Sequence, residues 1–200
     1  MKNIFFILIF FGGSFVYGQE NWTLEKTKSG VKAYSRIKDG ADYYEFRTIF
    51  RVEANLIEAK NLVTDVTNFK NWLPNTIDSK LLKKINDSLY YGYTVTETPW
   101  PLSDRDLVFK ATVKKVGSKL YSILLEGTPD YFAKDKSKVR VQEYKAQWII
   151  KEIQPNVVTV YYQASFNPGS TYPSWMIKNS MIDARIQTSL NFRAQLVKNR

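Results

Sequence analysis

The first candidate for chemistry is an arginine on the apolar side of a predicted strand. The strand begins at Arg105 and alternates polar with apolar side chains, so that Arg105 shares its face with Leu107, Phe109, Ala111 and Val113. A periodicity of two places these side chains on one side of a sheet. Because an unpaired guanidinium is expensive among apolar groups, the pattern predicts an acidic partner.

Glu97 is the predicted partner. In the strand before the intervening loop, Tyr91 and Tyr93 share a face that Glu97 continues. We therefore predict a Glu97–Arg105 ion pair that is buried or lines a cavity, where it could orient the polar head of an amphiphile. In the alternative, Arg105 lies at the mouth of its strand and reaches solvent or Asp104, because bulges often break the alternation at strand ends.

The sequence contains neither cysteine nor histidine. Without cysteine there can be no disulfide, no thiol nucleophile and no cysteine-ligated metal. Without histidine the commonest general base and metal ligand is missing, so Ser-His-Asp and Cys-His catalysis are excluded. Any chemistry has to use Asp, Glu, Tyr, Lys or Arg, and we expect neither a metal site nor a cofactor.

Residues 1–18 have the pattern of a secretory signal. Lys2 supplies the positive start, and Ile4 to Phe11 form an apolar run too short to span a bilayer. The alternatives are an uncleaved anchor or an N-terminal strand. We expect an exported protein, periplasmic or secreted, whose mature part is one domain over residues 19–200.

The charge balance is strongly basic. The net charge of +10 favours anionic partners such as lipid headgroups, and a transient contact with an anionic membrane surface is expected. The basic residues are scattered, without a helix-turn-helix, zinc-finger or RNA-binding signature, so we expect no nucleic acid partner. Nothing in the pattern indicates an obligate oligomer, and a monomer is expected.

The elements that position these residues are mostly strands. Strands are predicted at Val31–Arg36 and Tyr43–Val52, followed by helical segments at Asn55–Val66 and Asn68–Trp72. Three hairpins follow, over residues 77–95, 105–127 and 139–166. Such a series forms one curved antiparallel sheet. The predicted fold is α+β, with two short helices after the second or third strand and a long C-terminal helix.

That last helix is predicted over residues 173–198. Its apolar stripe has the helical repeat and consists of Trp175, Ile182, Ile186, Leu190 and Val197. The stripe must be buried, and the curved sheet is the large apolar surface available for it. Asn179 and Arg193 also project onto the stripe. Either they lie at its edge, or the helix covers a partly wet cavity rather than a solid core.

Several motifs resemble those of START (StAR-related lipid-transfer) domains. The stretch 99–108, Pro-Trp-Pro-Leu-Ser-Asp-Arg-Asp-Leu-Val, is similar to the family's proline-rich loop and its Arg-Asp strand. The segment from Phe69 to Trp72 resembles the family's helix ending in Trp. Asn167-Pro168-Gly169 before residues 173–175 resembles the lead into the last helix. The resemblance extends over nearly the whole of residues 21–197.

This resemblance implies a helix-grip fold, in which a sheet wraps a C-terminal helix around a tunnel that holds one lipid or sterol-like molecule. It implies a lid formed by Pro99, Trp100, Pro101 and Leu102, with Trp175 from the last helix. Together with the strand pattern, it predicts a ligand site made of Arg105, Glu97, Tyr91, Tyr93, Phe109, Tyr144, Trp148, Tyr162, Asn179, Ile182 and Ile186.

Three functions fit this pattern. The first is binding, and possibly transfer, of a hydrophobic molecule with no catalytic step. The second resembles polyketide aromatases and cyclases on the same fold, with Arg105, Glu97 and the tyrosines moving protons. The third is a module in which a bound ligand closes the lid and completes a partner surface. We favour the first, because aromatic side chains can bury a tail without covalent chemistry.

Overall fold

A curved sheet forms the body of the molecule. The computed structural model describes residues 21–41, 43–167 and 174–198, so the predicted signal sequence lies outside the described part. Within these ranges ten strands form one sheet. They are β1 (Thr23–Lys28), β2 (Val31–Ile37), β3 (Tyr44–Glu53), β4 (Thr76–Asn86), β5 (Leu89–Thr96), β6 (Arg105–Val116), β7 (Leu120–Gly127), β8 (Val139–Arg140), β9 (Tyr144–Gln154) and β10 (Val157–Phe166).

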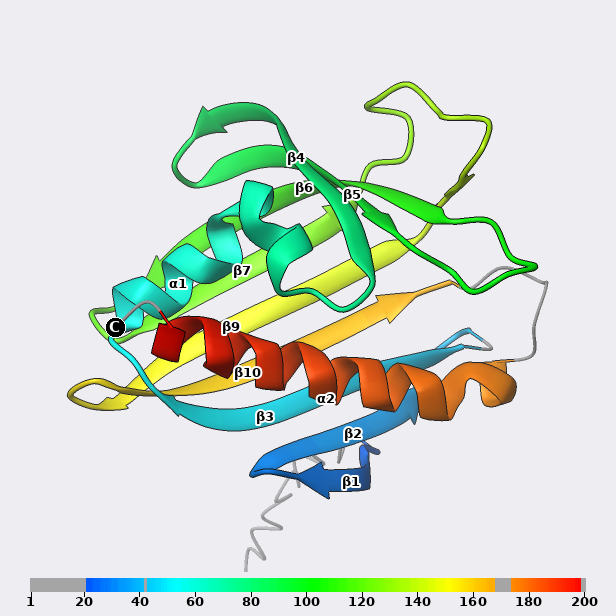
Figure 1. Cartoon of the computed structure of the whole chain (residues 1–200). Helices are drawn as coiled ribbons and strands as arrows, with labels where there is room; N and C mark the ends of the chain where they lie inside the picture. The colour runs from blue at the N-terminus through cyan, green and yellow to red at the C-terminus, as the bar shows by residue number, and fades with distance from the viewer. Residues whose placement is uncertain (1–20, 42, 168–173, 199–200) are drawn as a thin grey trace, which may run out of the picture.

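The sheet is antiparallel along its main path and curls around one face. Its strand order is β1-β2-β3-β10-β9-β7-β6-β5-β4, and β8 adds a short parallel pairing to β6. The three predicted hairpins are present as β4–β5, β6–β7 and β9–β10. The long helix α2 (Ser174–Lys198) lies in the concave side (Figure 1). The predicted α+β fold, a curved sheet wrapped around the C-terminal helix, is confirmed.

Two short helices follow β3 and cover the part of the concave face that α2 leaves open. They are α1 (Leu56–Thr64) and the 3₁₀ helix η1 (Val66–Asn71). The Asn55 side chain accepts a hydrogen bond from the Glu58 amide at 2.9 Å, and the Glu58 carboxylate accepts one from the Asn55 amide at 3.3 Å. This capping box fixes the start of α1, and it was readable from the Asn-x-x-Glu spacing.

The inward face of α2 is more polar than its predicted stripe and includes different residues near the C-terminus. Ile182 and Ile186 are buried as expected, but Val197 is exposed, and Phe192 takes the inward position near the end of the helix. Ser189 is also buried, with its hydroxyl 2.9 Å from that of Thr48 on β3. The helix therefore packs on the sheet through a mixture of apolar and hydrogen-bonded contacts.

Arg193 lies at the edge of α2, which was one of the two predicted placements. Its Nε donates to the Arg51 carbonyl at 2.9 Å, and its terminal nitrogens donate to the carbonyls of Ser29 and Gly30. Gly30 has a φ of +71°, a left-handed conformation that suits glycine. The guanidinium thus joins the β1–β2 turn to the end of the helix.

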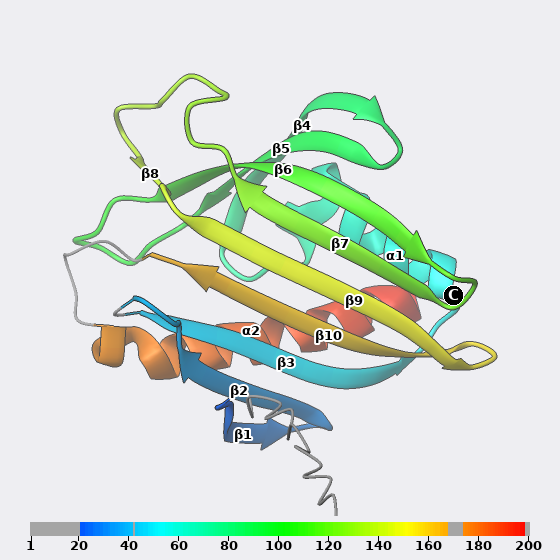
Figure 2. The ribbon, with the colours of Figure 1, turned by 180° about the vertical axis from the view of Figure 1, so that it is seen from behind.

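The convex side of β5 and β6 is also covered, which the sequence pattern did not indicate. Residues 128–138, which we call the outer loop, cross this side at the upper end of the sheet (Figure 2). The Tyr91 and Tyr131 rings stack 3.8 Å apart, and Tyr93 packs on Phe132 at 5.6 Å. These two strands are therefore buried on both faces.

A buried ion pair holds the outer loop in place. Arg140 donates to the two carboxylate oxygens of Asp106 at 3.0 and 2.8 Å, and both side chains are almost fully buried. The same guanidinium donates to the carbonyls of Pro129, Phe132 and Ala133. Such fork-to-fork geometry satisfies the buried charges of both partners.

The same pair explains one error in the predicted strands. A single strand from Val139 to Ile153 was expected, but it is divided into β8 and β9 with residues 141–143 between them. Val139 and Arg140 instead pair in parallel with Arg105 and Asp106 of β6. Turning Arg140 toward Asp106 takes β8 out of line with β9.

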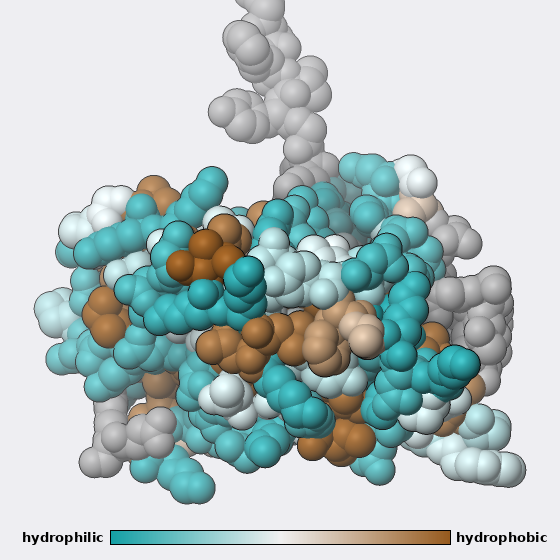
Figure 3. All heavy atoms as spheres, turned by 90° about the horizontal axis from the view of Figure 1, so that it is seen from above, coloured by the Kyte–Doolittle hydropathy of each residue, from teal (hydrophilic) through white to brown (hydrophobic). Residues whose placement is uncertain are grey.

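The edge strand β4 exposes isolated apolar side chains between lysines. Ile77, Leu81 and Ile85 are exposed, and Lys80 and Lys84 alternate with them. Viewed from above, apolar atoms on this side of the molecule are interrupted by hydrophilic ones (Figure 3). Charged residues on an edge discourage strand pairing between molecules. None of the helices in the described part of the chain has the length and apolarity needed to cross a bilayer.

The Asp106–Arg140 pair gives a stability prediction. Replacing Arg140 by Met leaves the Asp106 carboxylate buried without its partner, so the free energy of unfolding should fall by about 3–5 kcal/mol. Urea denaturation measures this loss. Lys110→Met is the control, on the strand that carries Asp106. It breaks the half-exposed pair between Lys110 and Glu126 and should cost at most about 1 kcal/mol. Equal losses in the two variants would contradict the assigned role of Arg140.

Candidate functional site

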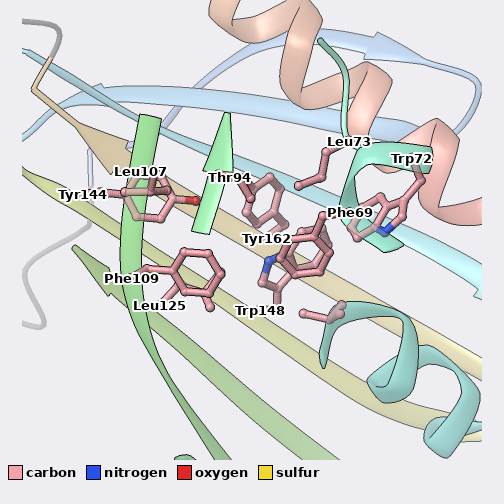
Figure 4. Close-up of a pocket in the computed structure, with 11 residues that line it drawn as sticks. Phe69, Trp72, Leu73, Thr94, Leu107, Phe109, Leu125, Tyr144, Trp148 and Tyr162 are labelled. Carbon is pink, nitrogen blue, oxygen red and sulfur yellow. The ribbon is translucent and has the colours of Figure 1, made fainter. Parts of the chain in front are cut away.

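The concave side contains a cavity between the helices and the sheet. Its volume is about 40 Å³. The floor comes from β5, β6, β7, β9 and β10, and the roof from α1, η1 and the residues just after η1 (Figure 4). It is lined by Val63, Phe69, Trp72, Leu73, Thr94, Leu107, Phe109, Leu125, Tyr144, Trp148 and Tyr162. Most of these side chains are apolar or aromatic, so the walls favour an apolar guest.

Stacked rings make much of the wall. Trp148 and Tyr162, on neighbouring strands, stack with centroids 3.9 Å apart and planes 13° from parallel. Trp72 meets Trp148 edge-on at 5.9 Å, and Phe69 stacks over Phe109 at 6.4 Å. These rings have few rotatable bonds and are held on several sides, so they provide a preformed apolar surface.

A glycine sets the position of Phe109. Gly92 lies opposite Phe109 on the neighbouring strand, and a Cβ atom placed at Gly92 would come within 2.4 Å of the phenylalanine Cζ. The ring therefore lies flat across the backbone of β5. Glycine in a strand commonly marks such a close approach, and here it leaves room for the ring to lie against the cavity wall.

The polar end of the site combines two tyrosines with an arginine of α2. Arg185 Nη1 donates to the Tyr162 hydroxyl at 2.7 Å. Tyr144 is the second tyrosine, and burial raises its pKa well above the usual range. Tyr144 and Tyr162 line the cavity, and Arg185 adjoins it behind Tyr162. The arrangement can hold a polar group by hydrogen bonds.

No metal centre is visible among these residues. Within residues 21–41, 43–167 and 174–198, no three acidic side chains come together as a possible metal site.

A model of the START domain family matches residues 17–199 of this sequence. The chain belongs to the START domain family. A crystal structure of a STAR-related lipid transfer protein from Xanthomonas axonopodis is 32% identical to it, with a TM-score of 0.81; the match covers 88% of this chain and 98% of that one. The family is known for lipid binding and transfer.

Two relatives show how far the sequence similarity extends. An uncharacterized protein of Pseudomonas aeruginosa is 28% identical over 179 residues, covering 90% of this chain and 88% of the relative. A phosphatidylcholine transfer protein of Rattus norvegicus is 26% identical over 163 residues, covering 78% and 75%. Both matches extend over most of the START domain.

Four of the predicted site residues do line the cavity of this START domain: Phe109, Tyr144, Trp148 and Tyr162. Their role in binding a ligand stays a prediction. Ile182 and Ile186 point inward from α2 as expected, but they are buried in the main core and do not line the cavity.

The predicted Glu97–Arg105 ion pair is not formed. Glu97 is exposed just beyond β5, and Arg105 is half-buried with Nη1 3.5 Å from the Thr98 hydroxyl. Arg105 does share a sheet face with Leu107 and Phe109, but its partner across the strands is Thr96. The placement at the mouth of the strand was the correct alternative. The buried arginine–carboxylate pair of this region is Arg140–Asp106, on the opposite face.

Tyr91 and Tyr93 were wrongly assigned to the cavity. Both lie on the convex side of β5, against the outer loop. The inward residues of β5 are Tyr90, Gly92 and Thr94, because Gly92 pairs with Phe109 and Thr94 with Leu107. The alternation along β5 was predicted correctly, but the outward face was taken for the inward one. Glu97, which continues the face of Tyr91 and Tyr93, was assigned to the wrong side for the same reason.

The remaining predicted positions lie at the surface or outside the described side chains. Asn179 is exposed, so its assignment to the ligand site is wrong. In the lid segment, Pro99, Trp100 and Pro101 are exposed while Leu102 is half-buried. Trp175 belongs to α2, but its side chain lies outside what the structure describes.

Arg185 is the main residue that the sequence reasoning missed. It lies three residues after Ile182 and four before Ser189, so it belongs to the same buried helical face as these residues. That spacing was available in the sequence. The remaining missed lining residues are Val63, Phe69, Trp72, Leu73, Thr94, Leu107 and Leu125.

The contact between Gly92 and Phe109 gives a second stability prediction. Gly92→Ala forces the ring out of its place, and the free energy of unfolding should fall by about 1–3 kcal/mol. In a Phe109→Leu background the same alanine should cost much less, because the clashing ring is absent. A double-mutant cycle in urea measures the coupling. Additive losses would show that the ring does not depend on the glycine.

Proposed function

We propose that this START domain binds a lipid or another hydrophobic small molecule in its cavity without changing it chemically, and carries it between membranes. The observation that supports this most directly is the aromatic cavity between α1, η1 and the concave sheet. The similarity to lipid transfer proteins supports the same class of ligand.

The cavity must enlarge to take such a ligand. Its volume of about 40 Å³ has room for only a few water molecules, whereas pockets for small ligands hold about 300–1,000 Å³. The stacked floor is the rigid part. The roof is tied to α2 by polar contacts, from Asn191 to the Trp72 carbonyl at 2.7 Å and from Gln195 to the Asn71 carbonyl at 3.3 Å. Ligand entry therefore requires the roof, α2 or the 98–104 lid to move.

The apolar walls supply enough free energy for binding. Burying apolar ligand surface contributes about 25 cal/mol per Å², so an alkyl tail with about 400 Å² of surface gains roughly 10 kcal/mol before the costs of association and opening. No covalent step is needed to hold it.

A cyclase-like enzyme is the second candidate, supported by the Tyr144–Tyr162–Arg185 cluster. Such groups could polarise a ligand carbonyl. However, burial raises the pKa of Tyr144, so this hydroxyl is a weaker acid than an ordinary tyrosine. General acids and bases work best with a pKa near the working pH. The cluster is therefore better suited to hydrogen bonding than to proton transfer.

The lid end of the molecule supports a transient contact with an anionic membrane. Trp100 is 92% exposed, and Tyr131 and Phe132 of the outer loop are partly exposed. The two loops are neighbours, because Val139 at the end of the outer loop hydrogen bonds to the Asp104 carbonyl at 2.9 Å. Amphipathic rings favour the headgroup region of a membrane, and the net positive charge favours anionic lipid.

The N-terminal pattern supports an exported location for this binding. We propose that residues 1–18 direct the protein out of the cytoplasm and that residues 19–200 act there as a monomer, periplasmic or secreted.

Filling the cavity should abolish binding. Thr94 is buried and lines the cavity, so Thr94→Trp should remove the lipid that co-purifies with the wild-type protein in native mass spectrometry. Tyr161→Trp is the control, because Tyr161 is exposed on the outer side of β10 and this variant should retain the lipid. Retention of the same lipid by a folded Thr94→Trp protein would place the binding site elsewhere.

Removing the exposed indole should weaken membrane contact. Trp100→Ala should reduce co-sedimentation with vesicles containing anionic phospholipid several-fold, and added salt should reduce it further because the remaining attraction is electrostatic. Ile153→Ala, at the opposite end of the sheet, should bind as the wild type does (Figure 1). Equal binding by all three proteins would argue against docking through the lid.

A further inference from the structure

Arg185 lies beside the cavity with an incomplete set of partners. Its Nη1 donates to Tyr162, and the guanidinium carbon lies 5.4 Å from the centroid of that ring. Its Nε is buried and has no hydrogen-bond partner within the described part of the chain. Ile182 and Ile186, the buried residues on either side of it, provide no polar contact.

Arg185 also lacks a carboxylate partner. Within residues 21–41, 43–167 and 174–198 it forms no salt bridge, although it stands two residues after Asp183. Asp183 is exposed and pairs with Lys26 at 2.6 Å. The contrast with Arg140 is sharp, because Arg140 is held by one carboxylate and three carbonyls. A cation with a buried, unpartnered nitrogen is costly to a folded protein unless something else completes its contacts.

The other unpartnered polar atom of the cavity is also a donor. Trp72 lines the roof and is almost fully buried, and its indole Nε1 has no hydrogen-bond partner within the described residues. Indole and guanidinium nitrogens can only donate. Together with the Tyr144 and Tyr162 hydroxyls, which can also donate, they place several donors in and beside the cavity, which suits a ligand rich in acceptor oxygens.

We infer that the cavity takes an anionic amphiphile, whose carboxylate or phosphate head binds Arg185 and the Tyr162 hydroxyl while its tail lies on the rings around Trp148. This deepens the proposed function and depends on it. Tyr162 contacts both the cavity and Arg185, so a head reaching the guanidinium would leave its tail on the stacked wall. Guanidinium binds carboxylate and phosphate through paired, charge-assisted hydrogen bonds, which neutral heads cannot match.

The test compares probes that share one tail. Delipidated protein is loaded with a neutral fluorescent probe, N-phenyl-1-naphthylamine, which is then displaced by dodecanoate, dodecyl phosphate, dodecylphosphocholine or dodecanol. The wild type should bind at least one of the two purely anionic compounds about tenfold more tightly than dodecanol. Preference for dodecanoate indicates a fatty acid as the natural source of the head, and preference for dodecyl phosphate indicates a phosphate-bearing lipid.

Variants assign the preference to one residue. Arg185→Gln should reduce the anion preference to less than threefold with dodecanol binding unchanged, and Arg185→Lys should restore part of it. Arg51→Gln makes the same change in net charge at an exposed position and should keep the full preference. Because Arg185 has an unpartnered nitrogen, the ligand-free Arg185→Gln protein should melt no lower than the wild type, which a purely structural residue would not allow.

Several results would overturn the inference. Equal affinity for dodecanol and both anions in the wild type would do so, as would a preference that survives Arg185→Gln or is lost in Arg105→Gln instead. A lower melting temperature with equal weakening of all four probes would show that Arg185 is structural. In each case the proposed hydrophobic binding stands. Displacement by none of the probes would remove both the inference and the proposed function.

Discussion

The width of the sheet is the constraint on which the rest of this structure depends. Strands lie about 4.8 Å apart and a helix with its side chains is about 10 Å wide, so one helix covers only two or three strands. The α2 helix lies against β1, β2 and β3, and α1 and η1 cover the side of β5, β7 and β9 (Figure 1). Two covers of different origin must meet over the middle of the concave face. The cavity lies on the α1 and η1 side of this line, above Trp148 and Tyr162.

That meeting line explains why the floor and the roof of the site are held by different kinds of contact. The floor consists of neighbouring strands joined by continuous ladders, and its rings stack on one another. Across the line, by contrast, Asn191 and Gln195 each donate to a carbonyl at the end of η1. Each of these hydrogen bonds contributes only about 0.5–1.5 kcal/mol net, and the edge-on contact of Trp72 with Phe192 at 6.0 Å adds apolar packing across the same line. Separating the two covers would break these contacts but none of the strand ladders of the floor.

The sequence predicted the three hairpins and the capping box of α1 because those features depend on local pattern, and the family resemblance together with the strand pattern predicted four cavity-lining residues. It did not decide which face of β5 is inward. Strands buried on both sides are apolar on both sides, so alternation alone cannot distinguish the faces. The outer loop buries Tyr91 and Tyr93, and its contacts are not local in sequence. Gly92 could have indicated the inward face of β5. A glycine opposite Phe109 marks the side of the sheet on which the phenylalanine ring lies flat.

The same distinction explains the error at the ion pair. The alternation of side chains along the strand placed Arg105 correctly on the inner face. Glu97 was then predicted as its ion-pair partner because it lies nearby in the sequence. The partner that Asp106 found is Arg140, 34 residues away in the chain. A buried charge is satisfied by whichever group the fold brings near, and only the parallel pairing of β8 with β6 brings this one. For Arg185 the sequence shows the position but not the partners. Its spacing from Ile182 and Ser189 indicates that it lies on the buried helical face, whereas the missing partner of its Nε is seen only in the structure.

The two ends of α2 are held by unequal interactions. Near its C-terminus, Phe192 is fully buried and packs on Phe50 at 5.6 Å and on Trp148 at 5.7 Å, and Arg193 joins three carbonyls. Nearer its N-terminus, the described contacts include the Lys178–Glu25 and Lys26–Asp183 pairs, which are at least partly exposed.

Exposed ion pairs contribute little, at most about 1 kcal/mol each, whereas a buried phenylalanine contributes several times more. A movement of α2 about its C-terminal end would keep the contacts of Phe192 and Arg193 while the helix moves away from the cavity. The N-terminal end that would move lies on the same side of the molecule as the 98–104 loop (Figures 1 and 2). Opening at this end would place the cavity entrance beside Trp100, the most exposed large apolar side chain among the described residues.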